Sequence, residues 1–200
     1  MQVRNATPAR QARRRQIVDA LIGVVADDGY DAATFGNIAR HAGLSSTRLI
    51  SYHFDDKDEL VRATMSEIFD RIAAHLDAPA PADPPTSALE RYVRSAIGLS
   101  STLPREMRAL AILFLRHRPS STPLWDRPQE DAAVGRVQEI LQTGQENGSM
   151  RPDFDPAVVA GAVQRAIDGI PLALALDPEI DVDHHADQLV DLFTRATAAT

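Results

Sequence analysis

Residues 43–60 read GLSSTRLISYHFDDKDEL, and this stretch decides the fold of the 200-residue chain. It combines a tight turn, a short helix with polar and basic side chains, an aromatic–imidazole pair and a following lysine. Residues 34–42, TFGNIARHA, precede it with an N-cap threonine and apolar residues at helical spacing. Gly43 supplies backbone freedom for the turn, and Leu44 is expected to fill the corner between two helices. This order of features predicts a helix-turn-helix that contacts DNA.

The charge is distributed as expected for a DNA-binding end on a body that does not bind DNA. Residues 1–52 contain seven arginines and four aspartates, a net charge of +3, whereas the whole chain carries −7 and the remainder therefore −10. Residues 1–18 hold five arginines and no acid. One domain that meets phosphate and one that does not would give this asymmetry. The alternative for the basic end is a solvated tail, which we expect for residues 1–9.

The composition predicts a globular protein of the cytoplasm. Apolar residues make up 44% of the chain and cysteine is absent, which fits a reducing compartment and excludes disulfides and thiolate metal sites. Asp19 interrupts the apolar stretch after the N-terminal arginines, which argues against a secretion signal, and we expect no membrane-spanning segment. The acidic and histidine-containing run 181–187 suits a helix start better than a metal site. No catalytic constellation is found, so the sequence predicts neither an enzyme nor a cofactor.

The hydrophobic periodicity predicts an all-α fold, with a three-helix DNA-binding domain over residues 10–56 and a domain of about six helices over residues 57–200. The later helices are expected near residues 56–78, 87–103, 104–117, 129–147, 156–176 and 186–196. The proline-rich segments 78–86 and 118–128 are expected to be loops.

The last two predicted helices, 156–176 and 186–196, are apolar around most of their circumference. A helix that is apolar all round is buried on both sides, and a second subunit would cover the second side. We therefore expect a homodimer through these helices, which would present two reading heads to palindromic double-stranded DNA. The alternative is that both helices lie in the core of a monomer.

The third helix is expected to turn short polar and basic groups toward base edges. The guanidinium of Arg48 can pair with O6 and N7 of guanine at once. The expected base contacts are Ser46, Thr47, Arg48 and Ser51, and the alternative for each is an ordinary solvent-facing side chain. Ser45 is expected to cap this helix, and its core residues are expected to be Leu49, Ile50 and Phe54.

Tyr52, His53 and Lys57 are expected to bind phosphates, which fixes the register on DNA without reading sequence. His53 has no serine, carboxylate or metal partner spaced around it, so a catalytic role is not expected.

Residues 13–60 resemble the N-terminal domain of TetR-family transcriptional regulators. The resemblance is carried by Ile17, Ala20, Gly29, Thr34-x-x-x-Ile38-Ala39-x-x-Ala42-Gly43-Leu44-Ser45 and Tyr52-His53-Phe54-x-x-Lys57-x-x-Leu60. It implies a further phosphate contact at Thr34, and a body that dimerises and binds an effector. The family most often represses transcription. The stretch from Gly43 to Phe54 is one residue longer than the family pattern, with the extra residue within 46–49, so base contacts carried over by analogy shift by one position.

The body is expected to bind a small hydrophobic effector whose occupancy moves the fourth helix and changes DNA affinity. The candidate pocket residues, each of which also suits an ordinary core, are Met65, Phe69, Tyr92, Ala96, Leu110, Phe114, Trp125, Val137, Leu141, Gln164 and Asp168. Gln164 and Asp168 interrupt an apolar helix at one-turn spacing, and either anchor a ligand or pair with Arg165 or a partner subunit. The alternatives are an architectural DNA-binding dimer without an effector, which would favour a basic body, and an all-helical enzyme.

Overall fold

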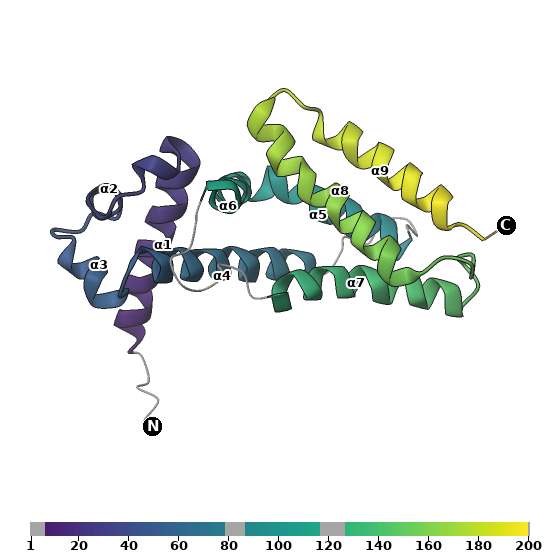
Figure 1. The fold of residues 1–200 in the computed structure, drawn as a ribbon, viewed down its shortest axis with the longest axis horizontal. Helices are drawn as coiled ribbons and strands as arrows, with labels where there is room; N and C mark the ends of the chain where they lie inside the picture. The colour runs from purple at the N-terminus through teal and green to yellow at the C-terminus, as the bar shows by residue number, and fades with distance from the viewer. Residues whose placement is uncertain (1–6, 79–86, 117–126, 200) are drawn as a thin grey trace. The chain divides into compact units, whose positions relative to one another are not determined.

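The computed structural model describes residues 7–78, 87–116 and 127–199, and within these ranges it contains nine α-helices, one 3-10 helix and no strand (Figure 1). This confirms the predicted all-α fold. The elements are α1 (Pro8–Asp28), η1 (Tyr30–Ala32), α2 (Phe35–His41), α3 (Arg48–His53), α4 (Lys57–Leu76), α5 (Ala88–Thr102), α6 (Pro104–Arg116), α7 (Arg127–Glu146), α8 (Pro156–Leu176) and α9 (Val182–Thr197).

The described residues form two compact units. The first comprises residues up to 70 together with 105–116, and the second comprises 71–104 and 127–199. The helix α4 is continuous across residues 70 and 71, so the first unit extends beyond the predicted domain boundary after residue 56. Residues 1–6 of the predicted N-terminal tail lie outside the described residues, whereas Pro8 and Ala9 already belong to α1.

The first half of the helix-turn-helix agrees with the sequence prediction. The hydroxyl oxygen of Thr34 accepts a hydrogen bond from the Asn37 backbone N–H at 3.2 Å, which confirms the predicted N-cap of α2. The chain then turns at Gly43, whose φ of +63° lies in the left-handed region. The backbone N–H of Leu44 donates to the carbonyl of Ala39 at 2.8 Å and closes the turn.

The predicted cap of the third helix is wrong. Ser45 precedes an irregular segment, and α3 begins at Arg48. The hydroxyl of Ser46 accepts a hydrogen bond from the Arg48 backbone N–H at 3.2 Å. A serine side chain that bonds the backbone two residues later stabilises a turn instead of a helix start, which accommodates the additional residue of this segment.

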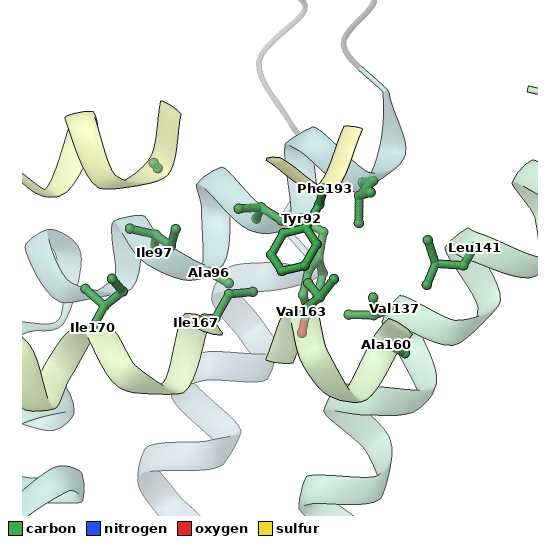
Figure 2. Close-up of a cluster of buried hydrophobic side chains, with 13 residues drawn as sticks. Tyr92, Ala96, Ile97, Val137, Leu141, Ala160, Val163, Ile167, Ile170 and Phe193 are labelled. Atoms are coloured by element: carbon green, nitrogen blue, oxygen red, sulfur yellow. The ribbon is translucent and has the colours of Figure 1, made fainter. Parts of the chain in front are cut away.

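The core of the second unit lies between α5, α7, α8 and α9 (Figure 2). Its fully or largely buried residues are Leu89, Tyr92, Val93, Ala96, Ile97, Val137, Leu141, Ala160, Val163, Ile167, Ile170, Ala186 and Phe193. They recur at helical spacing on each element, so each helix presents one apolar stripe to the others.

The helix α9 begins at Val182, earlier than the predicted start at residue 186. The carboxylate of Asp181 accepts a hydrogen bond from the His184 backbone N–H at 2.9 Å and so caps the helix. The acidic and histidine-containing run is therefore a helix start. Among the described residues, no group of three or more histidines and acids is placed to hold a metal ion.

The expectation that no segment is apolar enough to span a membrane is wrong for α8, which has sufficient length and apolar composition. The core helix of a water-soluble protein meets the same criterion. Here α8 packs on α7 and α5, and its residues Ala160, Val163 and Ile167 belong to the core of the second unit.

The left-handed conformation of Gly43 leads to a stability prediction. Gly43→Ala should lower the free energy of unfolding by about 1–2 kcal/mol, because a Cβ is strained at this φ. Gly36→Ala is the matched control: Gly36 lies in α2, and its added Cβ would meet nothing closer than 3.9 Å. This control should keep or raise stability. Urea denaturation of both variants measures the difference, and an equal effect of the two changes would contradict the role of the turn.

Candidate nucleic-acid interface

The short helix α3 has a buried face and an exposed face. Ile50 lies in the core of the first unit, and Phe54, which follows the helix, is also buried. Arg48 and Ser51 are exposed, and Tyr52 has 71% of its surface accessible. Ser46 and Thr47 are exposed just before the helix. The structure thus leaves all four predicted base-contacting residues accessible, and their contact with DNA stays a prediction.

Leu49 is not the core residue that the sequence predicts. It is 37% exposed and lies directly after Arg48 on α3. In a helix of only six residues, burial of Ile50 and His53 defines the inner face, and Leu49 falls at its edge. Apolar character alone therefore did not place this side chain.

An arginine of α1 holds the end of α3 and the start of α4. The guanidinium of Arg14 lies 4.1 Å from the centroid of the Phe54 ring and donates a hydrogen bond to the carbonyl of His53. It also forms an ion pair with Glu59 at 3.3 Å. The Arg14 side chain therefore connects α1, the end of α3 and the start of α4.

Glu59 also helps to cap α4. Its Oε2 accepts a hydrogen bond from the Asp55 backbone N–H at 2.6 Å, while Asp56 Oδ1 accepts one from the Glu59 backbone N–H at 2.7 Å. An acid followed three residues later by glutamate is the sequence signal of such a cap, which our sequence analysis did not use.

His53, predicted to bind phosphate, is buried, and its Nδ1 has no hydrogen-bond partner among the residues that the structure describes. Burial lowers the pKa of His53, and the positive charges of Arg10, Arg14 and Arg13 lower it further. A lowered pKa favours the neutral imidazole, which would contact a phosphate through a hydrogen bond.

Two of the other three predicted phosphate contacts, Lys57 and Thr34, already have structural partners. Lys57 Nζ lies 4.1 Å from the centroid of the Tyr30 ring. Burial lowers the pKa of the Lys57 ammonium, and Asp31 and Asp58 oppose this effect. The exposed Thr34 uses its hydroxyl oxygen to cap α2, which leaves its O–H free to donate.

The predicted pocket residues are distributed over both units of the described structure, and their role in binding a ligand stays a prediction. Tyr92, Ala96, Val137, Leu141 and Gln164 are buried in the second unit, while Met65 and Leu110 are buried in the first. Phe69 is half-buried, Phe114 is 38% exposed and Asp168 is exposed. Trp125 lies outside the described residues.

A chain of hydrogen bonds links the polar residues of the second unit. The Tyr92 hydroxyl donates to Gln164 Oε1 at 2.9 Å, and Gln164 Nε2 donates to Asp168 Oδ1 at 2.7 Å. Asp168 also lies 3.4 Å from the guanidinium of Arg165, so the predicted pairing with Arg165 is present. Burial raises the pKa of Tyr92 to about 12, so its hydroxyl remains a donor at neutral pH.

An open groove of about 630 Å³ borders Tyr92 on the side of Ala88, Arg136, Ile140 and Met150. Its wall includes the turn after α7, where the Met150 backbone N–H donates to the Gly144 carbonyl. The groove lies between α5 and this turn, which are far apart in the chain, so it has no periodic signal in sequence.

Residues 17–64, which run from α1 into α4, match the family described as bacterial regulatory proteins, tetR family. Over this segment the chain belongs to the TetR family. The matched segment contains the turn at Gly43, the exposed face of α3 and Lys57.

Two relatives of this TetR-family chain are regulators named HTH-type transcriptional regulator BetI. The one from Paraburkholderia phytofirmans is 26% identical over 164 residues, which cover 80% of this chain and 77% of the relative. The one from Cronobacter sakazakii is 44% identical over 68 residues, which cover 32% of this chain and 33% of the relative. The stronger identity is thus confined to a segment that spans about a third of that regulator.

Two solved structures share the fold over nearly the whole chain. A transcriptional regulator from Saccharomonospora viridis in complex with choline has a TM-score of 0.76 and 23% identity, covering 95% of this chain and 100% of that one. AibR in complex with isovaleryl coenzyme A and operator DNA has a TM-score of 0.69 and 19% identity, covering 90% and 97%. The TetR-family fold therefore extends through the second unit.

The lowered pKa of His53 predicts a pH dependence of stability. The unfolded chain, with a histidine pKa near 6.5, binds the proton more readily than the folded chain. The contribution of His53 is therefore complete above this value and is lost as the pH falls toward the folded-state pKa. His53→Gln should show a smaller fall in the free energy of unfolding between about pH 7 and about pH 5 than the wild type. Urea denaturation across this range measures it, and equal slopes would refute the assignment.

The hydrogen bond between Tyr92 and Gln164 predicts coupled effects on stability. Tyr92→Phe should lower the free energy of unfolding by about 1–3 kcal/mol, because it leaves a buried amide oxygen without its donor. Adding Gln164→Met removes that unpaired oxygen, so the double variant should lose less than the sum of the two single losses. Denaturant titrations of the four proteins complete the cycle, and additive losses would show that the two groups do not interact.

Proposed function

We propose that this protein is a ligand-responsive, sequence-specific DNA-binding transcriptional regulator of the cytoplasm, and that it represses transcription until a small molecule releases it. The observation that supports this most directly is the division of α3. Ile50 and Phe54 fix the helix in the head, while Arg48, Ser51 and Tyr52 face outward. A short helix held from behind with basic and hydroxyl groups in front is the arrangement that enters a major groove.

The exposed groups divide into two kinds of DNA contact. Arg48 is the principal base-reading residue, assisted by Ser46, Thr47 and Ser51, which are too short to reach far beyond the helix. Thr34, Tyr52, His53 and Lys57 bind the backbone phosphates on either side and set the register.

We further propose that two copies associate through α8 and α9 and bind a palindromic operator. Four of the large apolar side chains that are exposed lie on these helices: Val158, Leu172, Leu176 and Leu192. Leu176 alone is 81% exposed. Large apolar side chains on the two last helices of a bundle indicate a partner surface, and a second copy of the chain would bury them.

The effector is proposed to bind in the second unit, where the hydrogen-bond chain from Tyr92 through Gln164 to Asp168 supplies the polar groups in an apolar core. Two solved structures with this fold, the regulator from Saccharomonospora viridis and AibR, contain choline and isovaleryl coenzyme A, respectively. A ligand shifts DNA affinity only if it binds the two conformations differently, so a ligand that competes for Gln164 would be able to act as a switch.

The test of this function starts from the wild-type protein and a pool of random-sequence duplexes. Recovery of a shared, two-fold symmetric sequence would support the reading head and the dimer. The recovered duplex is then titrated with protein in the presence of a panel of hydrophobic and charged metabolites. Release by one compound would support the repressor mechanism, whereas binding that no compound alters would favour an architectural DNA-binding dimer. Failure to enrich any sequence would overturn the proposal.

Substitutions at Arg48 and Lys57 separate base contacts from phosphate contacts. Arg48→Ala should weaken binding to the recovered duplex by about 1–3 kcal/mol and largely spare random DNA, because a bidentate guanine contact is lost. Lys57→Ala should weaken all duplexes alike and reduce the salt slope by about one. Fluorescence anisotropy at several salt concentrations measures both. Equal losses on specific and random DNA for Arg48→Ala would contradict its base-reading role.

A further inference from the structure

The first turns of α1 carry an arginine face that runs beside the end of α3. Arg10, Arg13 and Arg14 are spaced three and four residues apart, so they share one side of the helix. The guanidinium of Arg10 lies 5.9 Å from the centroid of the Tyr52 ring. Arg14, one turn later, contacts Phe54 and the His53 carbonyl. This face therefore continues the exposed surface of Tyr52 onto a second helix.

The three arginines have different internal partners. Arg14 is held by the Phe54 ring and Glu59. Arg13 is exposed and donates one hydrogen bond, to Gln16 Oε1 at 2.7 Å, which leaves most of its five N–H donors for other groups. Arg10 contacts an aromatic face, which uses no N–H donor at all. Thus Arg10 and Arg13 keep donors that the fold does not require.

The histidine at this edge is a second unusual feature of the same surface. His53 is more than nine-tenths buried, and its Nδ1 has no hydrogen-bond partner among the described residues. It lies next to Tyr52, whose ring it meets edge-on with centroids 5.0 Å apart. Buried polar atoms of side chains are paired in most native structures, so this unpaired atom distinguishes the edge beside the arginine face from an ordinary core.

We propose that Arg10 and Arg13 form a second phosphate-binding element, which contacts the DNA backbone outside the base pairs faced by Arg48. The inference rests on the proposed DNA-binding function and extends it to α1. Arginine suits this position because its planar fork donates two N–H groups to one phosphate. The electrostatic surroundings also suit it, since residues 1–18 contain five arginines and no acid.

The test uses the full-length Arg10→Gln/Arg13→Gln variant and the duplex that the wild type recovers from a random pool. Each lost phosphate contact reduces the salt slope by about 0.9, so the slope should fall by about two for each head. Between 50 and 200 mM salt the wild type should therefore lose roughly tenfold more affinity per head than the variant. The base preference should stay unchanged, because phosphates carry no sequence information.

Duplex length supplies a second readout. Trimming the flanking base pairs while keeping the symmetric core should weaken wild-type binding. The same trimming should have little effect on the variant, which has already lost the outer contacts. If the two proteins respond equally to trimming, the contacts do not lie outside the core and the proposal is wrong.

Two matched variants control for charge and for folding. Arg10→Lys/Arg13→Lys keeps both charges and should retain most of the salt slope. Arg15→Gln removes one charge from the same run but from the side of α1 near Asp19 and His41, and should leave the slope unchanged. An equal loss for Arg15→Gln would show a diffuse effect of net charge and overturn the assignment to this face. Thermal unfolding should be similar for all four proteins.

The outcome remains interpretable if the operator hypothesis fails. Phosphate contacts act on any sequence, so the difference in salt slope should also appear on a random duplex. A wild type that selects no sequence but still shows this difference would reject the proposed function and keep the phosphate-binding element. Equal slopes for the wild type and Arg10→Gln/Arg13→Gln on both duplexes would reject the element alone.

Discussion

The contact of Arg14 with the junction of α3 and α4 is the interaction on which the reading head depends. One guanidinium covers the buried ring of Phe54, binds the carbonyl that ends α3 and pairs with Glu59 of α4. Glu59 in turn accepts from the backbone at Asp55, before α4 starts. A six-residue helix has too few internal hydrogen bonds to hold its own orientation, so its position is set by these contacts from outside.

This arrangement separates residues that hold the head from residues that remain available. Arg48, Ser51 and Tyr52 are exposed on α3, because the junction is fixed by Arg14 from another helix. Thr34 and Lys57 combine both roles, since one caps α2 and the other lies on the Tyr30 ring. A substitution at either of these positions would therefore change folding together with the proposed DNA contact, whereas a change at Arg48 would affect chiefly the proposed DNA contact.

Much of this fold could be predicted from local chemistry. Contacts between residues far apart in the chain could not be predicted in this way. The Thr34 cap, the Gly43 turn and the apolar stripes of the later helices follow from spacing and propensity. The predicted start of α3 was wrong because the hydroxyl of Ser46 stabilises a turn. The prediction that Leu49 lies in the core was wrong because a short helix buries few positions. The roles of Arg14 and Gln164 depend on partners 39 to 72 residues away, which no local pattern encodes.

The polar chain in the second unit restricts which effectors could bind at the proposed site. Tyr92 and Gln164 pair inside a core that is otherwise apolar, Gln164 also donates to the exposed Asp168, and leaving either buried group unpaired is costly. An apolar ligand that merely pushed Gln164 aside would lose this hydrogen bonding and gain little. A ligand that replaces Asp168 as the acceptor of the Gln164 amide keeps the chain satisfied and frees an exposed carboxylate. The proposed site would therefore favour effectors that carry a hydrogen-bond acceptor on an apolar body.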